Sequence, residues 1–384
     1  MSTGGHIRAR GPGAWELKYD VGRDPKTGRR ITKYATVRGK KSAAQAELRR
    51  LLGTVDVGQH VDPGKLTVGQ WLAQWLKEAR HTVSSKTHER YTGIVNQHLV
   101  PALGPLQLAK LAPVHIQSFY SDALSNGRVD GKGGLSPQTV VHFGRVLNIA
   151  MKSAKKLRLI ASNPVEDAAR PKIEDKEMQT LTDEQAGQLL AAASTTRLYV
   201  PLVVALATGL RRGELVALRW QDVDLDTAII TVVRSIEQTK EGLRVKPPKT
   251  KRGKRPVVLP ASAVEILRAH KVAQAEERLA LGLGQSDLVF TRVDGDMIKP
   301  NSFSSWVARV AKRAGVSHIM PVHGLRHTHI TNLLHANVHP KVASERAGHS
   351  RVGFTLDRYS HCIPSLQEDA AARIDAGLSK AIAG

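Results

Sequence analysis

The chain contains one cysteine, few aromatic residues and too few acidic residues to balance its basic ones. Cys362 alone cannot form an internal disulfide, which predicts a reducing compartment such as the bacterial cytoplasm. No apolar run approaches the ~18 residues that a membrane-spanning helix needs. The first residues, Met1–Arg8, lack the apolar core of a secretion signal. These absences argue against a disulfide-rich secreted protein and against a membrane protein.

Positive charge is what the sequence has in excess. Its 57 lysine and arginine residues outnumber 34 aspartate and glutamate residues, for a net charge of +23 with histidine neutral. Such a charge predicts a polyanionic partner, with nucleic acid ahead of an anionic membrane surface. Residues 1–64, 65–172 and 173–384 are each net positive. We therefore expect the partner to contact every segment, the alternative being a basic surface that serves only solubility.

The first segment, residues 1–64, has the pattern of a small sheet with one helix. Residues 15–21 and 30–37 alternate between apolar and polar side chains on either side of a turn at 24–28, and a helix follows over 42–52. A sheet of this size fits the major groove of DNA, the alternative being an accessory hairpin. The basic side chains at or near its turn are Arg29, Arg30 and Lys33.

Residues 65–164 have helical spacing throughout, which predicts an all-α domain. Its longest helix begins at Ser136-Pro137, an N-cap followed by proline, and ends near Leu159. The side chains that we expect to contact DNA here are Lys86, Arg145 and Lys152.

Residues 165–182 are polar, contain proline and lack periodicity, which predicts a linker to a third domain over 183–384. That domain combines helices with short strands. The strands are expected at 228–234, 243–249 and 256–259, and the first helices at 183–193, at 198–208 and from 212.

Two motifs of the third domain are suited to an oxyanion. Arg211 precedes a helix, so that its guanidinium and the free backbone N–H groups face the same way. The basic stretch 248–255, expected on a hairpin, supplies a lysine that reaches a phosphate. We choose Lys249, with Lys251 and Lys254 as alternatives.

Two further motifs follow near the carboxyl end. His323 and Arg326 lie three residues apart at the start of a helix and so share one face. Tyr359 follows His349 by ten residues in a polar stretch. A phenol of pKa about 10 attacks at neutral pH only when cations stabilise its anion or a base takes its proton, and the nearby arginines and histidines supply both. A structural tyrosine is the alternative reading.

The distribution of histidine is one that metal sites can have, because half of the 16 histidines lie between His318 and His361. His323 and His327 have the i, i+4 spacing of zinc helices, but no glutamate follows His323 and Arg326 would repel a dication. We expect no metal.

The ordered set of Arg211, a lysine in the basic stretch, His323-x-x-Arg326, Gly348-His349 and Tyr359 resembles the signature of the tyrosine recombinases, specifically the phage integrases. Residues 65–164 are similar to that family's core-site-binding domain, and residues 1–64 to the arm-site-binding domain of its longer members. Ala347 stands where the family often has leucine, and Asn337 where glycine often ends a helix; asparagine tolerates the left-handed conformation needed there.

The resemblance implies a multidomain, mainly α fold with small β elements. It comprises an N-terminal three-stranded sheet plus helix, an all-α, SAM-like core-binding domain and a mixed α+β catalytic domain. It also implies that Tyr359 attacks a scissile phosphate to give a 3′-phosphotyrosyl bond and a free 5′-hydroxyl. Arg211 and Arg326 would neutralise the transition state, and Lys249 would protonate the leaving oxygen.

By the same resemblance, His323 is the general base or proton relay for Tyr359, and His349 donates a hydrogen bond to the phosphate. Glu214, one turn after Arg211, would hold Arg211 or His323 in place. No metal or cofactor is required, because protein cations take the metal's role.

The implied partners are double-stranded DNA with core-type and arm-type attachment sites, three further copies in a homotetramer on DNA, a host DNA-bending protein and an excision factor. The implied setting is the bacterial cytoplasm, at the nucleoid, with the gene carried by a phage or mobile element. The tail after Tyr359 either docks on a neighbouring protomer or folds back in cis. Its apolar residues at helical spacing are Ile363, Leu366, Ala370, Ile374 and Leu378.

Three other functions stay open. A resolvase or transposon recombinase would use the same Tyr359 chemistry without integrating a phage. A catalytically silent DNA-binding regulator would lose nothing in vitro on Tyr359→Phe. A metal-dependent nuclease built on the histidine cluster would be sensitive to EDTA.

Overall fold

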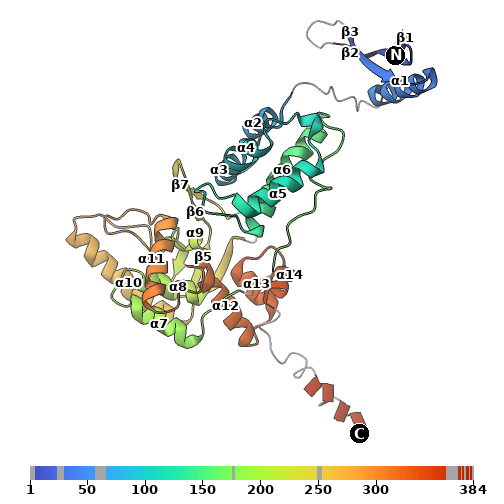
Figure 1. The fold of residues 1–384 in the computed structure, drawn as a ribbon. Coiled ribbons are helices and arrows are strands. Elements are labelled where there is room, and N and C mark those ends of the chain that lie inside the picture. The colour runs from blue at the N-terminus through green and yellow to red at the C-terminus, as the bar shows by residue number, and fades with distance from the viewer. Residues whose placement is uncertain are drawn as a thin grey trace. The chain divides into compact units, whose positions relative to one another are not determined.

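The computed structural model describes residues 5–23, 30–56, 66–174, 178–248 and 253–359, together with four residue pairs of the tail at 371–372, 374–375, 378–379 and 381–382. Its contacts divide the chain into two units, Met1–Glu174 and Asp175–Gly384 (Figure 1). The first unit holds two separate cores, one in the sheet near the N-terminus and one among helices. Within the described residues, no helix is long and apolar enough to cross a membrane.

The sheet near the N-terminus has three antiparallel strands in the order β1-β2-β3, packed on one helix. In its register Leu17 faces Ala35 and Tyr19 faces Lys33. Leu17 and Tyr19 are buried with Ala44 and Leu48 of the helix, which is the small core that the alternating pattern predicted. The expected turn at 24–28 lies outside the described residues. The elements are β1 (Gly5–Gly11), β2 (Ala14–Arg23), β3 (Arg30–Arg38) and α1 (Lys41–Asp56).

The helices of residues 66–174 enclose one core. Trp71 is buried at its centre and donates its indole N–H to the Ala150 carbonyl over 3.1 Å, which ties the first helix to the last. Val165 and Ala168, which the sequence placed in the linker, pack into this core instead. The elements are α2 (Val68–Ala79), α3 (Ser85–Ile94), a π-helical segment (Val95–Leu99), α4 (Val100–Leu103), α5 (Pro113–Asn126) and α6 (Pro137–Lys156).

The second unit is mainly helical, with a large core and a small satellite core around Tyr359. The satellite core contains Ile330, Leu334, Ala343, Ala347 and Tyr359. Its helices are α7 (Asp183–Ala193), α8 (Tyr199–Thr208), α9 (Arg212–Leu215), α10 (Ala261–Ala280), α11 (Pro300–Arg313), α12 (His323–His335), α13 (Pro340–Ala347) and α14 (Val352–Tyr359).

The strands of this unit form two sheets, with the orders β4-β5-β8 and β6-β7. The expected strand over 228–234 is shorter, and a further strand that the sequence did not reveal follows it. The expected hairpin around 248–255 is wrong, because β7 pairs with β6 and β8 pairs with β5. The basic stretch 248–255 therefore connects two different sheets. The strands are β4 (Val223–Asp224), β5 (Ile229–Val232), β6 (Ser235–Thr239), β7 (Gly242–Lys246) and β8 (Arg255–Val258).

Candidate active site

Arg211 stands at the N-cap of α9, after the left-handed Gly209 has ended α8 at φ 62°. Its guanidinium donates to Glu214 Oε1 over 2.9 Å and to the Gly348 carbonyl over 2.7 Å. Its backbone N–H, which we expected to be free for an anion, donates to Glu214 Oε2 over 2.9 Å. The anion-binding capacity of this position therefore lies in the guanidinium, whose side chain is 38% exposed.

Arg326, on α12, comes to the same place from another part of the chain. It donates to the Gly209 carbonyl over 2.7 Å and to the Ala347 carbonyl over 2.6 Å. Burial and then the charge of Arg211 lower its pKa to about 9, so that it still carries its charge at neutral pH. Arg211 and Arg326 thus hold consecutive carbonyls, those of Gly348 and Ala347, immediately before His349. Two of the five N–H groups of each guanidinium are used in this way, which leaves others for a ligand.

Glu214 lies between two cations. Its carboxylate accepts from Arg211 and also from Arg255, whose Nη2 lies 2.9 Å from Oε2. Burial alone would raise the pKa of Glu214, but hydrogen bonds and charges from Arg255 and Arg211 outweigh it and lower that pKa. Of the two roles expected for Glu214, the structure shows the contact with Arg211. Arg255 also donates to the Arg346 carbonyl over 2.7 Å, a contact that the sequence did not reveal.

His349 is buried beside α14. Its Nδ1 lies 2.8 Å from the hydroxyl of Thr355, and its ring meets the ring of Phe354 edge-on. Burial lowers the pKa of His349 to about 3, helped by the charges of Arg326, Arg211, Arg255 and His327. The ring is therefore neutral at physiological pH, with one nitrogen protonated. Thr355 was not singled out in the sequence, although it belongs to the stretch that ends at Tyr359.

Tyr359 ends α14 and is only 1% exposed. Its hydroxyl lies 2.5 Å from Nδ1 of His327. The phenol is also near enough to Arg326 for the negative charge of its ionised form to raise the pKa of that guanidinium, although burial and Arg211 lower it overall. The structure therefore brings the phenol to the arginine cluster within one subunit.

His323 begins α12 after an uncommon backbone turn. Val322 has φ 63° and ψ −46°, and the His323 N–H donates to the Pro321 carbonyl over 2.7 Å, which closes a γ-turn around a buried β-branched residue. The pKa of His323 is lowered by partial desolvation and by the charges of Arg326, Arg212 and Arg211. Its ring centroid lies 6.2 Å from that of His327. Asn337, expected to be left-handed, has φ 57°.

Two of the three candidate lysines, Lys249 and Lys251, lie outside the described residues. Lys254 is exposed. Residues on both sides of 249–252 form contacts of their own. Lys246 forms an ion pair with Glu237, and the Gly253 carbonyl accepts from Arg255 over 3.1 Å.

The expected DNA contacts are placed as follows. Arg29 lies outside the described residues, and Lys33 is half-buried. Arg145 is exposed on α6. Three others form ion pairs at partly exposed positions: Arg30 with Asp20 at 3.7 Å, Lys86 with Glu89 at 3.1 Å and Lys152 with Glu166 at 3.4 Å.

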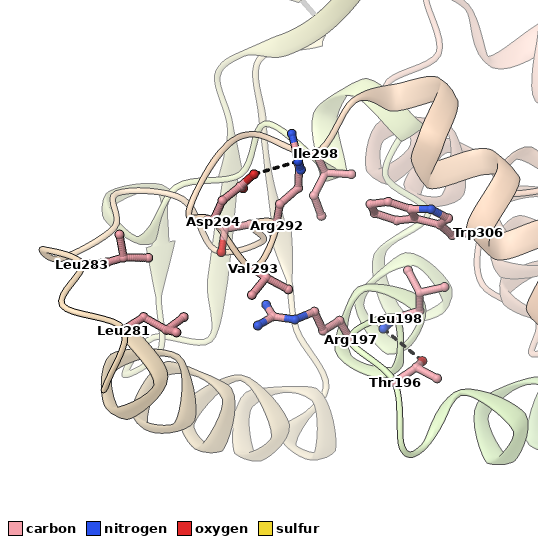
Figure 2. A pocket seen from close by; sticks show the side chains of 11 residues that line it. Thr196, Arg197, Leu198, Leu281, Leu283, Arg292, Val293, Asp294, Ile298 and Trp306 are labelled. Atoms are coloured by element: carbon pink, nitrogen blue, oxygen red, sulfur yellow. Dashed lines mark hydrogen bonds and ion pairs between the residues drawn. The ribbon is translucent and has the colours of Figure 1, made fainter. Parts of the chain in front are cut away.

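The second unit also has a cavity lined by other segments, with a volume of about 760 Å³ (Figure 2). Its wall is largely apolar, with Leu198, Ile298 and Trp306 from different segments, and Arg292 pairs with Asp294 at 2.7 Å at its edge. In the part of the chain that the structure describes, no group of three His, Cys, Asp or Glu side chains could hold a metal ion.

Comparisons with known proteins agree with the geometry. Residues 179–364 match the model of the phage integrase family, and residues 67–124 match that of the phage integrase N-terminal SAM-like domain. The chain is 28% identical to a tyrosine recombinase XerC-like protein of Caldanaerobacter subterraneus, over 94% of this chain and 95% of that protein.

Two solved structures have a similar fold. The Tn1549 transposon integrase in complex with a circular intermediate DNA matches with a TM-score of 0.65 and 22% identity, covering 80% of this chain and 99% of that one. The lambda integrase tetramer bound to a Holliday junction matches with a TM-score of 0.54 and 19% identity, covering 90% and 95%. The expected mainly α fold, with a SAM-like domain and an integrase catalytic domain, is confirmed.

Proposed function

We propose that this chain, whose residues 179–364 match the phage integrase family, is a site-specific recombinase that integrates a phage or mobile DNA element. One observation carries this proposal. Arg211 and Arg326, 115 residues apart in the numbering, bind the adjacent carbonyls of Gly348 and Ala347, and Tyr359 belongs to the same small core as Ala347. A nucleophile and two phosphate-binding cations therefore meet at one loop.

In this proposal the Tyr359 oxygen attacks the scissile phosphorus while the bond from phosphorus to the 5′-oxygen breaks. The products are a 3′-phosphotyrosyl bond and a free 5′-hydroxyl. Arg211 and Arg326 bind the nonbridging oxygens and offset the charge of the five-coordinate transition state. Lys249 gives the leaving oxygen its proton, with Lys251 and Lys254 as the alternatives.

His349 donates a hydrogen bond to the phosphate through Nε2–H. This assignment requires Nδ1 to accept, and the Thr355 hydroxyl at 2.8 Å is placed to donate to it. His323, beside the charges of Arg326, Arg212 and Arg211, takes the second of the two roles that the resemblance implies, that of proton relay for Tyr359. Glu214 positions Arg211.

The substrate is double-stranded DNA, read at core-type sites by the helical domain and at arm-type sites by the sheet near the N-terminus. Two duplexes with two cleavages each require four protomers, and the similar lambda integrase is a tetramer on a Holliday junction. Because strand exchange through a covalent intermediate is close to isoenergetic, a host DNA-bending protein and an excision factor set its direction. The proposed setting is the bacterial cytoplasm, at the nucleoid.

The test incubates the full chain with nicked duplexes that carry candidate attachment sites, so that the nicked strand diffuses away and the covalent adduct accumulates. We expect a DNA-linked peptide that contains Tyr359. Tyr359→Phe should retain DNA binding and form no adduct. Arg211→Ala should abolish cleavage and weaken binding only mildly, because many other basic residues share the backbone contacts. An adduct on another residue would refute the proposal.

A further inference from the structure

The hydroxyl of Tyr359 is paired with a histidine that lies outside the motif identified in the sequence. His327 Nδ1 lies 2.5 Å from that hydroxyl, and the two ring centroids are 5.8 Å apart at an interplanar angle of 45°. The contact joins α12 to α14. Such a distance is within hydrogen-bond reach for direct proton transfer between a base and the hydroxyl it activates.

We propose that His327 is the general base that removes the phenolic proton of Tyr359 during strand cleavage. The inference rests on the proposed function. As the Tyr359 oxygen bonds to phosphorus, its proton passes to Nδ1 of His327, and the bond from phosphorus to the 5′-oxygen breaks. On religation the 5′-hydroxyl returns its proton to the lysine that supplied it and attacks phosphorus. The phosphotyrosyl bond breaks, and the departing phenolate recovers its own proton from His327.

The surroundings of His327 keep it in the form that a base requires. Burial, followed by the charges of His323, Arg326 and Arg358, lowers its pKa to about 4. His349 also interacts with it electrostatically. At neutral pH the ring is therefore uncharged, and the tautomer with its proton on Nε2 leaves the Nδ1 lone pair for the phenol.

A base with so low a pKa is weak against a phenol, so its transfer must be coupled to substrate binding. The scissile phosphate adds a negative charge beside a group of cations that otherwise repel a proton on His327. Its arrival raises the proton affinity of His327, and bonding to phosphorus lowers that of the phenolic oxygen. Proton transfer is thereby favoured in the complex with DNA rather than in the free protein.

His323, which the sequence resemblance names as base or relay, occupies a different position. Its ring centroid lies 6.2 Å from that of His327, one turn earlier on α12, beside Arg211, Arg212 and Arg326. These neighbours suit contact with the phosphate. The two histidines thus have different roles: His327 acts on the Tyr359 hydroxyl, and His323 faces the scissile phosphate.

The decisive variant is His327→Asn, because the asparagine oxygen replaces Nδ1 as a hydrogen-bond acceptor but does not take the proton. Adduct formation is measured on the nicked duplex at saturating protein between pH 6 and 9.5. At pH 7 we expect a loss of about 100-fold, the lower end of what general base catalysis contributes. The rate of the variant should then rise about tenfold per pH unit, as hydroxide takes over, while the wild-type rate stays nearly level.

Two further measurements separate catalysis from packing. His327→Ala should be rescued in proportion to added imidazole, which a purely structural role would not produce. His335→Asn, at the exposed end of the same helix, should match the wild type at every pH. Circular dichroism and DNA affinity verify that each variant folds and binds.

The outcomes of this experiment distinguish the two proposals. If His327→Asn forms adduct at the wild-type rate and with the wild-type pH profile, His327 is not the base although the protein is a recombinase. If the wild type forms no adduct with any attachment-site duplex, the proposed function fails and this inference fails with it.

Discussion

Arg255 and Glu214 form an ion pair in which Nη2 and Oε2 lie 2.9 Å apart and both side chains are at most 5% exposed. The pair connects the start of β8, which is also the end of the basic stretch 248–255, to the helix that begins beside Arg211. Arg255 also donates to the Arg346 carbonyl near the end of α13. One buried guanidinium thus connects three segments around Arg211 and Arg326.

Removing Arg255 should therefore destabilise the second unit. Arg255→Met leaves Glu214 buried with Arg211 as its remaining partner, and losing one partner of a buried pair costs about 3–5 kcal/mol. Urea unfolding measures this cost. Arg268→Met, which removes an exposed pair with Asp226, should cost less than about 1 kcal/mol. Equal losses in the two variants would contradict a structural role for the buried pair.

Thr355 should affect the rate of adduct formation by fixing the tautomer of His349. Thr355→Val keeps the shape of this fully buried side chain but removes the hydroxyl at 2.8 Å from Nδ1. With the tautomer no longer fixed, we expect the rate of adduct formation to fall about tenfold, the equivalent of one hydrogen bond. Thr355→Ser restores a hydroxyl and should recover most of the rate. A valine variant as fast as the wild type would show that the orientation of His349 has another source.

Substitution of Gly348 should be more destabilising than its backbone angle alone predicts. It ends α13 at φ 66°, its carbonyl accepts from Arg211, and an added Cβ would lie 2.8 Å from the Arg255 guanidinium. Gly282 has the same φ of 66°, but an added Cβ would meet nothing within 4 Å.

The comparison of Gly348→Ala with Gly282→Ala isolates that contact. Gly282→Ala should cost about 1 kcal/mol for the left-handed backbone and leave adduct formation unchanged. Gly348→Ala should cost more and also slow adduct formation, because Arg255 and the Gly348 carbonyl must move. Thermal unfolding and single-turnover cleavage are the measurements, and identical behaviour of the two variants would rule out the proposed crowding.

Acid should destabilise the second unit through His329. Burial lowers its pKa to about 4, with Arg346 as the next cause, while the unfolded chain protonates near the ordinary value of 6.5. Because the unfolded state binds the proton more readily, the stabilisation is complete above pH 6.5 and is lost as the pH falls through about 4. The loss from this group between pH 7 and 4 is roughly 3 kcal/mol.

The variant His329→Asn tests this, since an amide retains a donor for the Leu206 carbonyl, 2.7 Å from Nδ1, and does not titrate. The unfolding free energy of the variant should depend less steeply on pH between 7 and 4 than that of the wild type. His335→Asn on the same helix should leave the wild-type slope unchanged. A slope unaffected by His329→Asn would place the acid sensitivity elsewhere.

The sequence predicted well what is encoded in contiguous stretches. The periodicities located β2, β3, α1 and α6 of the first unit but not β1, and the motifs around Arg211, His323 and Tyr359 identified residues that the fold then brings together. Arg326 was found because it stands three residues from His323 on one helix.

Contacts between distant segments escaped prediction. Nothing next to Arg255 in the sequence distinguishes it from the other basic residues of 248–255, and its burial follows only from the pairing of β8 with β5. The hydrogen bond of His327 depends on how α14 packs against α12. The hairpin was wrong for a similar reason, since strand polarity and turn residues do not determine which neighbour a strand selects.

The depth of the Tyr359 side chain has a consequence for how the protein behaves when no attachment site is near. A phenol that is 1% exposed is shielded from water, from oxidants and from stray duplexes that touch the basic surface. Because a buried hydroxyl cannot reach a phosphate, we expect cleavage to require that this side chain first become exposed to the bound strand.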